Sequence, residues 1–260
     1  MGQVTLEISG AVGILTLDAP TMNAMDRAMV AQLEDLLGQC ERDDGVGAVL
    51  VRGAGGRAFS AGSDVAELQG LIARGPQALK EKFEQDRRVF GALAHLPKPT
   101  IAAIEGAAIG GGLELAVCCD YIVTGRSAKL ALPEIKLGVF PGSGGTVRVT
   151  RRIGPARATR IMLSGETVAT ETALSWGLID ELVDDNAVIA SALAKAERMA
   201  SGPALAMQAC KEAIAAAANG SEQDALDVAD RWAVELGFTE DALEGMKAFA
   251  EKRRPVFKRN

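Results

Sequence analysis

The sequence predicts an α/β fold in which short parallel strands alternate with helices, followed by a helical C-terminal third. Three observations support this prediction. Short apolar segments rich in β-branched residues recur at residues 47–52, 99–105 and 120–124, with helical patterns between them. Strand patterns become sparse after Pro155. The chain has 260 residues, of which 48% are hydrophobic, and this is enough to bury a large core.

The N-terminal region predicts two strands, a helix and a third strand. Residues 4–8 and 12–17 are rich in β-branched side chains around a glycine-containing break, a pattern typical of a hairpin. Asp26 is placed to cap a helix in which apolar residues recur at spacings of three and four, ending near residues 38–40. The continuous apolar run at 47–52 predicts a strand that is buried on both faces.

The region after Pro155 predicts a series of helices, because apolar residues keep a helical spacing there. The expected helices span residues 157–163, 170–176, 187–199, 204–218, 223–236 and 240–251. The expected N-caps are Thr170 and Ser201 or Ser221, and the expected stops are Gly177, Gly220 and Gly237.

The composition favours a protein that acts on small molecules. Twenty-eight basic and 34 acidic residues give a net charge of −6, which argues against nucleic acid or an anionic membrane as a partner. No window of roughly 18 apolar residues is free of charge, and no signal peptide is apparent, so we expect a cytoplasmic protein. The four cysteines lack the spacing of a zinc site, so we expect reduced thiols and no metal.

The chain has one histidine, His95, which follows a predicted helix and precedes a predicted strand. Neither an orienting acid nor a nucleophile stands beside it, so we expect a structural or surface role. A Ser-His-Asp hydrolase and a His-ligated metal site are therefore disfavoured.

A cluster of glycines precedes the first candidate catalytic acid. Residues 110–112 are all glycine and open an apolar helix after the strand at 101–105, which leaves backbone N–H groups unshielded at the helix start. This geometry binds anions, although tight strand–helix packing is an alternative. Glu114 lies in the first turn of the helix among apolar residues, where a carboxylate either caps the helix or takes part in chemistry.

A second acid and two further glycine turns follow the same logic. Glu134 stands among apolar residues just before the glycine-dense helix start at 141–146. Two semi-buried carboxylates beside turns rich in N–H groups predict a general acid–base pair with oxyanion donors. A solvent-facing loop acid is the alternative for Glu134. In the turn at 59–64, Ser63 or Asp64 can cap the next helix, and capping alone explains both residues.

Three segments together resemble the crotonase (enoyl-CoA hydratase/isomerase) superfamily. Residues 58–64 are Ala-Phe-Ser-Ala-Gly-Ser-Asp, residues 110–114 are Gly-Gly-Gly-Leu-Glu, and residues 132–146 begin Leu-Pro-Glu-Ile-Lys-Leu-Gly. Their order and separations match the family. The similarity extends from Asn23-Ala24 to the segment at 249–257.

The resemblance implies a spiral of β-β-α repeats over residues 1–200, which holds the active site, and a helical region over residues 201–260. The helical region is expected to form a homotrimer, or a hexamer made of two trimers. The implied substrate is a coenzyme A thioester, of which coenzyme A is itself a part. No other cofactor is expected, and the implied setting is fatty acid β-oxidation.

The resemblance also assigns residues to the site. The thioester oxygen is held by the backbone N–H groups of Ser63 and Gly111. The family more often has Ala at position 63, and we expect the hydroxyl to be harmless because only the backbone is used. The implied substrate contacts are Ala24, Ala61, Ser63, Asp64, Val65 and Gly111.

The two acids indicate the reaction, since family members that hydrate enoyl thioesters carry both glutamates. We expect Glu114 to position and deprotonate a water, Glu134 to deliver a proton to C2, and the Gly142 N–H to hold the same water. The expected activity is that of a hydro-lyase, which converts 2-enoyl-CoA to 3-hydroxyacyl-CoA by reversible syn addition of water.

Four alternatives remain open at this point. An enoyl-CoA isomerase or a carnitinyl-CoA-type dehydratase belongs to the same superfamily. A Clp-like serine protease shares the spiral fold in outline, and a suitably placed Ser and His are missing. An RNA-binding homologue is supported only by basic residues in the tail at 252–258. Arg57 and this tail are also the candidates for coenzyme A phosphate contacts, and residues 67–90 are expected to cover the acyl group.

Overall fold

The computed structural model describes residues 2–258 of the chain. The strands are β1 (Gln3–Ser9), β2 (Val12–Asp18), β3 (Ala48–Gly53), β4 (Ala58–Ser60), β5 (Thr100–Ile104), β6 (Ala107–Ile109), β7 (Tyr121–Gly125), β8 (Lys129–Ala131) and β9 (Glu181–Val183). The α-helices are α1 (Arg27–Arg42), α2 (Val65–Ala73), α3 (Pro76–Ala94), α4 (Gly111–Ala116), α5 (Gly145–Ile153), α6 (Pro155–Ser164), α7 (Thr170–Trp176), α8 (Val188–Ala200), α9 (Ala204–Asn219), α10 (Glu222–Leu236) and α11 (Glu240–Ala250). The short 3-10 helices are η1 (Glu134–Leu137) and η2 (Asp185–Ala187).

The strands form two sheets that the chain visits in turn. The six-stranded sheet has the order β1-β2-β3-β5-β7-β9, and the three-stranded sheet has the order β4-β6-β8. Apart from the β1–β2 hairpin, the strand pairs in these two sheets are parallel. From β3 to β8, each pair of consecutive strands adds one strand to each sheet before a helix follows. The predicted spiral of β-β-α repeats is thus confirmed.

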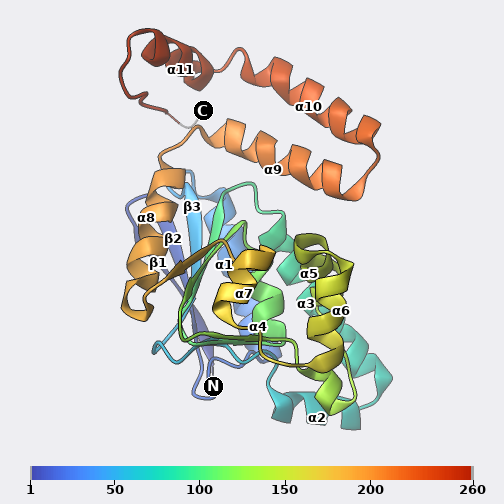
Figure 1. The fold of residues 1–260 in the computed structure, drawn as a ribbon. Coiled ribbons are helices and arrows are strands. Elements are labelled where there is room, and N and C mark those ends of the chain that lie inside the picture. The colour runs from blue at the N-terminus through green and yellow to red at the C-terminus, as the bar shows by residue number, and fades with distance from the viewer. Residues whose placement is uncertain (1, 259–260) are drawn as a thin grey trace.

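Helices cover both faces of the six-stranded sheet (Figure 1). β3 is buried on both faces, as predicted: Ala48 and Leu50 pack beneath α8, whereas Val49 and Val51 pack with α1, α3 and α4. On the α8 side, small residues allow a close approach of the helix to the sheet, and these residues are Ala192, Ala196 and Ala200.

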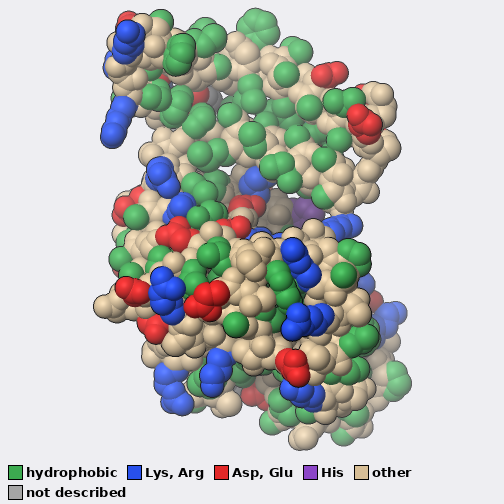
Figure 2. Space-filling view, in the orientation of Figure 1, with side chains coloured by type: hydrophobic (Ala, Val, Ile, Leu, Met, Phe, Trp, Pro, Cys, Tyr) green, Lys and Arg blue, Asp and Glu red, His purple; other side chains and the backbone are tan. Residues whose placement is uncertain are grey.

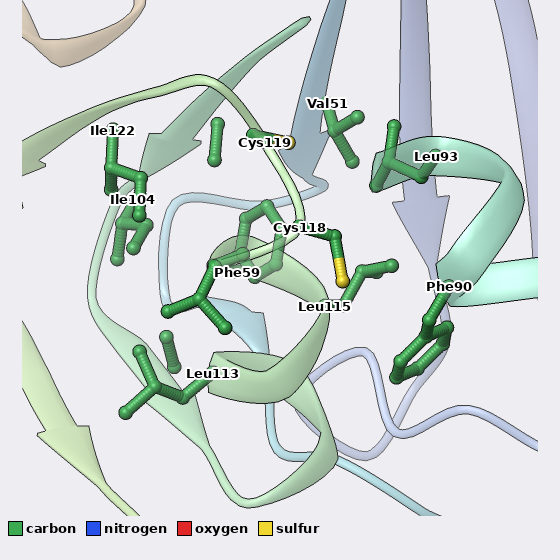
Figure 3. Packing of buried hydrophobic residues seen from close by; sticks show 14 of the residues in the cluster. Val51, Phe59, Phe90, Leu93, Ile104, Leu113, Leu115, Cys118, Cys119 and Ile122 are labelled. Atoms are coloured by element: carbon green, nitrogen blue, oxygen red, sulfur yellow. The ribbon is translucent and has the colours of Figure 1, made fainter. Parts of the chain in front are cut away.

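The opposite face carries the larger core, which also seats the short helix α4. Phe59 of β4 and Phe90 of α3 pack in it with Leu113 and Leu115 of α4 (Figure 3). All four side chains are almost fully buried. This apolar packing holds α4 rigidly, and α4 carries two of the predicted site residues.

The helix α1 begins as predicted and ends slightly later. The Asp26 side chain accepts a hydrogen bond from the Met29 N–H at 2.8 Å and so caps the helix. The helix continues to Arg42, beyond the predicted end at residues 38–40, because Leu37 and Cys40 still face the core. Burial of these side chains outweighs the glycine at position 38.

The last three helices, α9, α10 and α11, stand away from the sheets (Figure 1). Ser221 caps α10 in a capping box with Asp224, and Gly220 and Gly237 follow the ends of α9 and α10, as predicted. The division into regions 1–200 and 201–260 stays a prediction. No helix within residues 2–258 is both long and apolar enough to cross a lipid bilayer.

Two expected N-caps were wrong. Ala169, not Thr170, precedes α7, and the Thr170 hydroxyl instead donates to the Arg126 carbonyl at 3.0 Å. Ser201 follows the end of α8, where its hydroxyl donates to the Arg198 carbonyl. In both cases the hydroxyl donates to a backbone carbonyl, and no side chain caps the start of α7 or α9 within residues 2–258.

The strands β4, β6, β8 and β9 were not predicted. Each has three residues, which is too short to show an alternating or continuous apolar pattern. One of them, β6, lies between the strand β5 and the glycine cluster that precedes α4. The glycines therefore follow the three-stranded sheet rather than the strand at 101–105.

Candidate active site

The turn that follows β4 is anchored by the segment that precedes α1. The Met25 N–H donates to the Gly62 carbonyl at 2.7 Å, and the Asp64 N–H donates to the Met25 carbonyl at 3.0 Å. The side-chain amide of the buried Asn23 donates to the Ala58 carbonyl at 2.8 Å. Two segments that are distant in the sequence thus fix the path of the backbone through this turn.

The turn brings the predicted oxyanion donors together. Gly62 has a φ of +90°, and a Cβ atom there would lie 2.8 Å from the Gly111 nitrogen. A Cβ atom on Gly111 would lie 3.5 Å from the Ser63 nitrogen. Neither the Ser63 nor the Gly111 N–H donates to an acceptor in the part of the chain that the structure describes. Only glycine at position 62 permits this approach of the two turns.

Glu114 is buried, with 2% of its surface exposed. Its Oε1 atom accepts hydrogen bonds from the Ser143 N–H at 3.0 Å and the Gly145 N–H at 2.6 Å. Its Oε2 atom has no partner within residues 2–258. Burial raises the pKa of Glu114 to about 7 against these two donors, and the charges of Glu134 and Asp86 add to the increase.

Glu134 begins η1 and is half-buried. Its Oε2 atom is buried and lacks a hydrogen-bond partner among the described residues. A Cβ atom on Gly110 would lie 3.0 Å from its Oε1 atom, which places the carboxylate at the start of α4. Burial raises the pKa of Glu134. An unpaired oxygen in this position is free to meet a group that enters the site.

The remaining predicted substrate contacts surround the same turn. Ala24 is buried and directly precedes the anchoring residue at position 25, while Ala61 is half-buried within the turn itself. Asp64 is the N-cap of α2 and accepts a hydrogen bond from the Glu67 N–H at 2.8 Å. Its carboxylate is therefore occupied by capping. Val65 is 57% exposed at the start of α2 and faces solvent.

Gly142 lies at the edge of the second turn. A Cβ atom there would lie 2.9 Å from the Phe83 ring, so the position accepts only glycine without a shift of that ring. The N–H groups that reach Glu114 come from Ser143 and Gly145. The water-binding role of Gly142 stays a prediction.

Residues 7–260 match the family model described as enoyl-CoA hydratase/isomerase. The chain belongs to the enoyl-CoA hydratase/isomerase family. It is 37% identical over 259 residues to a probable enoyl-CoA hydratase of Bacillus subtilis, with 99% of each chain covered. It is 34% identical over 260 residues to the 2,3-dehydroadipyl-CoA hydratase of Escherichia coli, again with 99% of each covered.

Solved structures of this family share the fold. An enoyl-CoA hydratase from Bacillus anthracis superposes with a TM-score of 0.94 at 31% identity, covering 99% of this chain and 100% of that one. An enoyl-CoA hydratase/carnithine racemase from Magnetospirillum magneticum superposes with a TM-score of 0.91 at 34% identity, covering 100% and 97%. The family resemblance of the three motifs is thus confirmed.

Beside the motifs of the enoyl-CoA hydratase/isomerase family, the site contains a buried ion pair on α3 that was not predicted. The Lys82 and Asp86 side chains lie 2.5 Å apart. Lys82 donates to the Ser63 hydroxyl at 2.7 Å, and the Ser143 hydroxyl donates to Asp86 at 2.6 Å. The i,i+4 spacing of Lys82 and Asp86 is also that of ordinary surface pairs on a helix, so the sequence carried no signal of their burial.

His95 and the basic tail lie outside this site. His95 is the exposed C-cap of α3, and its Nδ1 atom lies 2.8 Å from the Gly91 carbonyl oxygen. In the tail, Arg253 pairs with Glu244 and Lys258 pairs with Glu240. Within residues 2–258, no group of three His, Cys, Asp or Glu side chains is arranged to hold a metal ion.

Proposed function

We propose that this protein catalyses the reversible addition of water to 2-enoyl-CoA thioesters, giving 3-hydroxyacyl-CoA. One observation carries the proposal: two carboxyl groups with raised pKa values lie beside two backbone N–H groups that donate to no acceptor within residues 2–258. This arrangement supplies a proton acceptor, a proton donor and an oxyanion site in one place. The names of the Bacillus subtilis and Escherichia coli relatives support the same reaction.

The oxyanion site activates the substrate. The N–H groups of Ser63 and Gly111 bind the thioester oxygen, on which enolate-like charge develops when C3 is attacked. These donors are fixed by the turn before the reaction starts, so they stabilise the transition state without reorganisation. The loss of one such donor typically costs about 3 kcal/mol of barrier, or about a hundredfold in rate.

The two glutamates move the protons. Ionised Glu114 accepts a proton from a water whose oxygen bonds to C3, while protonated Glu134 gives its proton to C2 on the same face of the double bond. The cycle ends with Glu114 protonated and Glu134 ionised. Proton exchange with solvent restores the starting form, and dehydration runs the same steps in reverse. Burial raises the pKa of both carboxyl groups, and the charge of Glu134 raises that of Glu114 further, so the pair favours holding one proton over two ionised groups.

The substrate contacts follow from the same turn. We propose that Ala24, Ala61 and Val65 line the coenzyme A pocket. Asp64 is proposed to contribute indirectly, because it caps α2 and so fixes the start of that helix. Gly142 is proposed to hold the attacking water through its N–H. No cofactor beyond the coenzyme A of the substrate is proposed, because hydration changes no overall oxidation state and the backbone donors polarise the thioester.

We propose that the chain forms a homotrimer or a pair of trimers through its last three helices. Large apolar side chains are exposed there, and Figure 2 shows hydrophobic surface over these helices; the side chains include Ile214, Leu226, Val234, Phe238, Met246 and Phe249. A groove of about 1000 Å³ lies between α9 and the facing residues of α3, α5 and the segment 117–120. Light scattering after gel filtration tests the assembly, and a monomer at micromolar concentration contradicts it.

We also propose that the protein works in the cytoplasm and serves fatty acid β-oxidation. The four cysteines are free thiols, two of them adjacent and fully buried, which suits a reducing compartment. In the stepwise oxidation of acyl thioesters, a dehydrogenation supplies the 2-enoyl group and an oxidation consumes the 3-hydroxyl group. The paired charges of the basic tail favour neither RNA nor a membrane as a partner.

The function is tested with crotonyl-CoA, whose conjugated enoyl absorbance is lost on hydration. Wild type is compared with Glu114→Gln, Glu134→Gln and the surface control Glu84→Gln. We expect each of the first two variants to lose about 10²- to 10⁴-fold in kcat and the control to lose none. A wild type that instead creates this absorbance from 3-enoyl-CoA is an isomerase, which overturns the hydratase proposal.

A further inference from the structure

A continuous chain of polar side chains, buried except for the half-buried Ser63, joins the two turns of the site through α3. Lys82 Nζ donates to Ser63 Oγ at 2.7 Å and to Asp86 Oδ2 at 2.5 Å, and Ser143 Oγ donates to the same Asp86 oxygen at 2.6 Å. At one end, the Ser63 N–H is the proposed oxyanion donor. At the other end, the Ser143 N–H donates to Glu114 at 3.0 Å.

The ion pair at the centre of this chain is shielded from water. The side chains of Lys82 and Asp86 are each 4% exposed. A buried ion pair is seldom more stabilising than apolar residues of the same volume, because both charges lose their hydration. Stability alone is therefore a weak reason for this pair. One half-turn earlier on α3, the pair of Lys80 and Glu84 has ordinary surface geometry, with exposures of 65% and 46%.

The connection matters because each half of the site is assembled from two separate pieces. The helix α4 carries both Gly111 and Glu114. Their partners, Ser63 and Ser143, come from two turns that lie 80 residues apart in the sequence, and α3 ties these turns to each other. A displacement of one turn against α4 moves an N–H donor relative to the group it serves, and errors of about 1 Å cost up to about a hundredfold in rate.

We propose that Lys82 and Asp86 are positioning residues, which hold the oxyanion turn and the Glu114-binding turn in register through the hydroxyls of Ser63 and Ser143. The Ser63 hydroxyl, for which the sequence suggested only a capping role that Asp64 takes instead, is then one of the two attachment points. The inference rests on the proposed function for the reaction that it serves. It assigns a role to side chains that are neither acid, base nor oxyanion donor.

The sharpest variants are Ser63→Ala and Ser143→Ala. Each removes one hydroxyl and keeps both backbone N–H groups and both charges, whereas removing Lys82 leaves a buried charge unpaired and endangers folding. We expect each serine variant to lose about tenfold in kcat with KM within twofold of wild type. Lys80→Met on the exposed face of α3 is the matched control and should keep wild-type kinetics.

Two further readouts distinguish positioning from a structural role. A conjugated aryl-acryloyl-CoA absorbs at longer wavelength when donors polarise its thioester oxygen, so Ser63→Ala should reduce this shift on binding while Ser143→Ala leaves it unchanged. Asp86→Asn removes a negative charge that raises the pKa of Glu114, and its amide oxygen can still accept from the Lys82 ammonium and the Ser143 hydroxyl, so Lys82 keeps a hydrogen-bond partner. The acid limb of kcat/KM should then move to lower pH in Asp86→Asn. In Ser143→Ala it should move to higher pH, because a loosened turn weakens the Ser143 N–H bond that lowers the pKa of Glu114.

Glu134 is the other acid whose charge acts on Glu114, and it is unchanged in all these variants. The proposal is wrong if both serine variants melt like wild type and keep kcat and the spectral shift within twofold. If wild type shifts the absorbance band and hydrates no enoyl-CoA, the proposed function fails on its own. In that case the absorbance band of the aryl-acryloyl-CoA bound to Ser63→Ala still tests the inference for the oxyanion turn. A smaller shift than with wild type supports the inference, and an unchanged shift overturns it.

Discussion

Replacement of Glu114 by Gln is expected to stabilise the folded protein while it lowers kcat by about 10²- to 10⁴-fold. The carboxyl group is 2% exposed, and its pKa rises from 4.5 to about 7 in the folded protein because burial disfavours the charge. Glutamine keeps the shape of the side chain, and its amide oxygen can accept the same hydrogen bonds from Ser143 and Gly145. The variant therefore removes a buried charge without removing its contacts.

The magnitude depends on pH with a defined sign. The folded state holds the Glu114 proton more tightly than the unfolded state, so the free energy of unfolding of wild type falls as the pH rises from 4.5 to about 7. At about 1.4 kcal/mol for each pKa unit, the loss is about 3 kcal/mol. The advantage of the glutamine variant should thus grow from near zero at about pH 4 to about 3 kcal/mol at about pH 8.

Urea denaturation of wild type and Glu114→Gln over this pH range measures the difference. The protein concentration is kept constant, because assembly of subunits also contributes to the apparent stability. Glu84→Gln on the surface of α3 corrects for the general effect of losing one negative charge. A difference that does not change with pH, or a glutamine variant that is less stable than wild type at about pH 8, refutes the argument.

Three further outcomes are expected. Gly62→Ala should lower kcat for crotonyl-CoA by at least about a hundredfold, because the added Cβ would stand 2.8 Å from a backbone nitrogen of the facing turn. The control Gly70→Ala, where no atom lies within 4 Å of the added Cβ, should keep the wild-type kcat, and equal rates in the two variants contradict the prediction. In Glu134→Gln, the residual kcat/KM should lose the basic limb of wild type, because that limb reports loss of the Glu134 proton that the mechanism delivers to C2; a basic limb that stays in a pH series contradicts this. Phe59→Ala should lower the free energy of unfolding by about 3–5 kcal/mol in urea, because the ring is fully buried, and a loss below about 1 kcal/mol argues against its place in the core.

Much of the fold was predictable because its signals are local. The strands at 47–52, 99–105 and 120–124 are continuous apolar runs, and their separation by helices predicted parallel pairing. The glycines at residues 62 and 112 marked the places where backbones approach each other. The three-residue strands of the second sheet carried no such pattern, since their pairing depends on the neighbouring turns of the spiral.

Part of the candidate site was also predictable from local signals, and part was not. The residues that stand in short sequence motifs could be selected from the sequence alone, and they are Ser63, Gly111, Glu114 and Glu134. Their roles in the reaction stay predictions. No motif indicated the hydrogen bond between Lys82 and Ser63. The sequence around a lysine in a charged helix is the same whether the side chain faces solvent or the core.

Local patterns therefore determined the α/β class, the glycine turns and the identity of the two acids, and the resemblance of the motifs to a known family implied the spiral. Tertiary structure decided which donors hold Glu114, how far its pKa rises, and that an ion pair on α3 is buried between two turns. The physical reason is that burial and hydrogen bonding at this site join residues up to 57 positions apart, as between Asp86 and Ser143. Such contacts arise from the packing of the helices against the sheets, and short-range sequence patterns do not encode them.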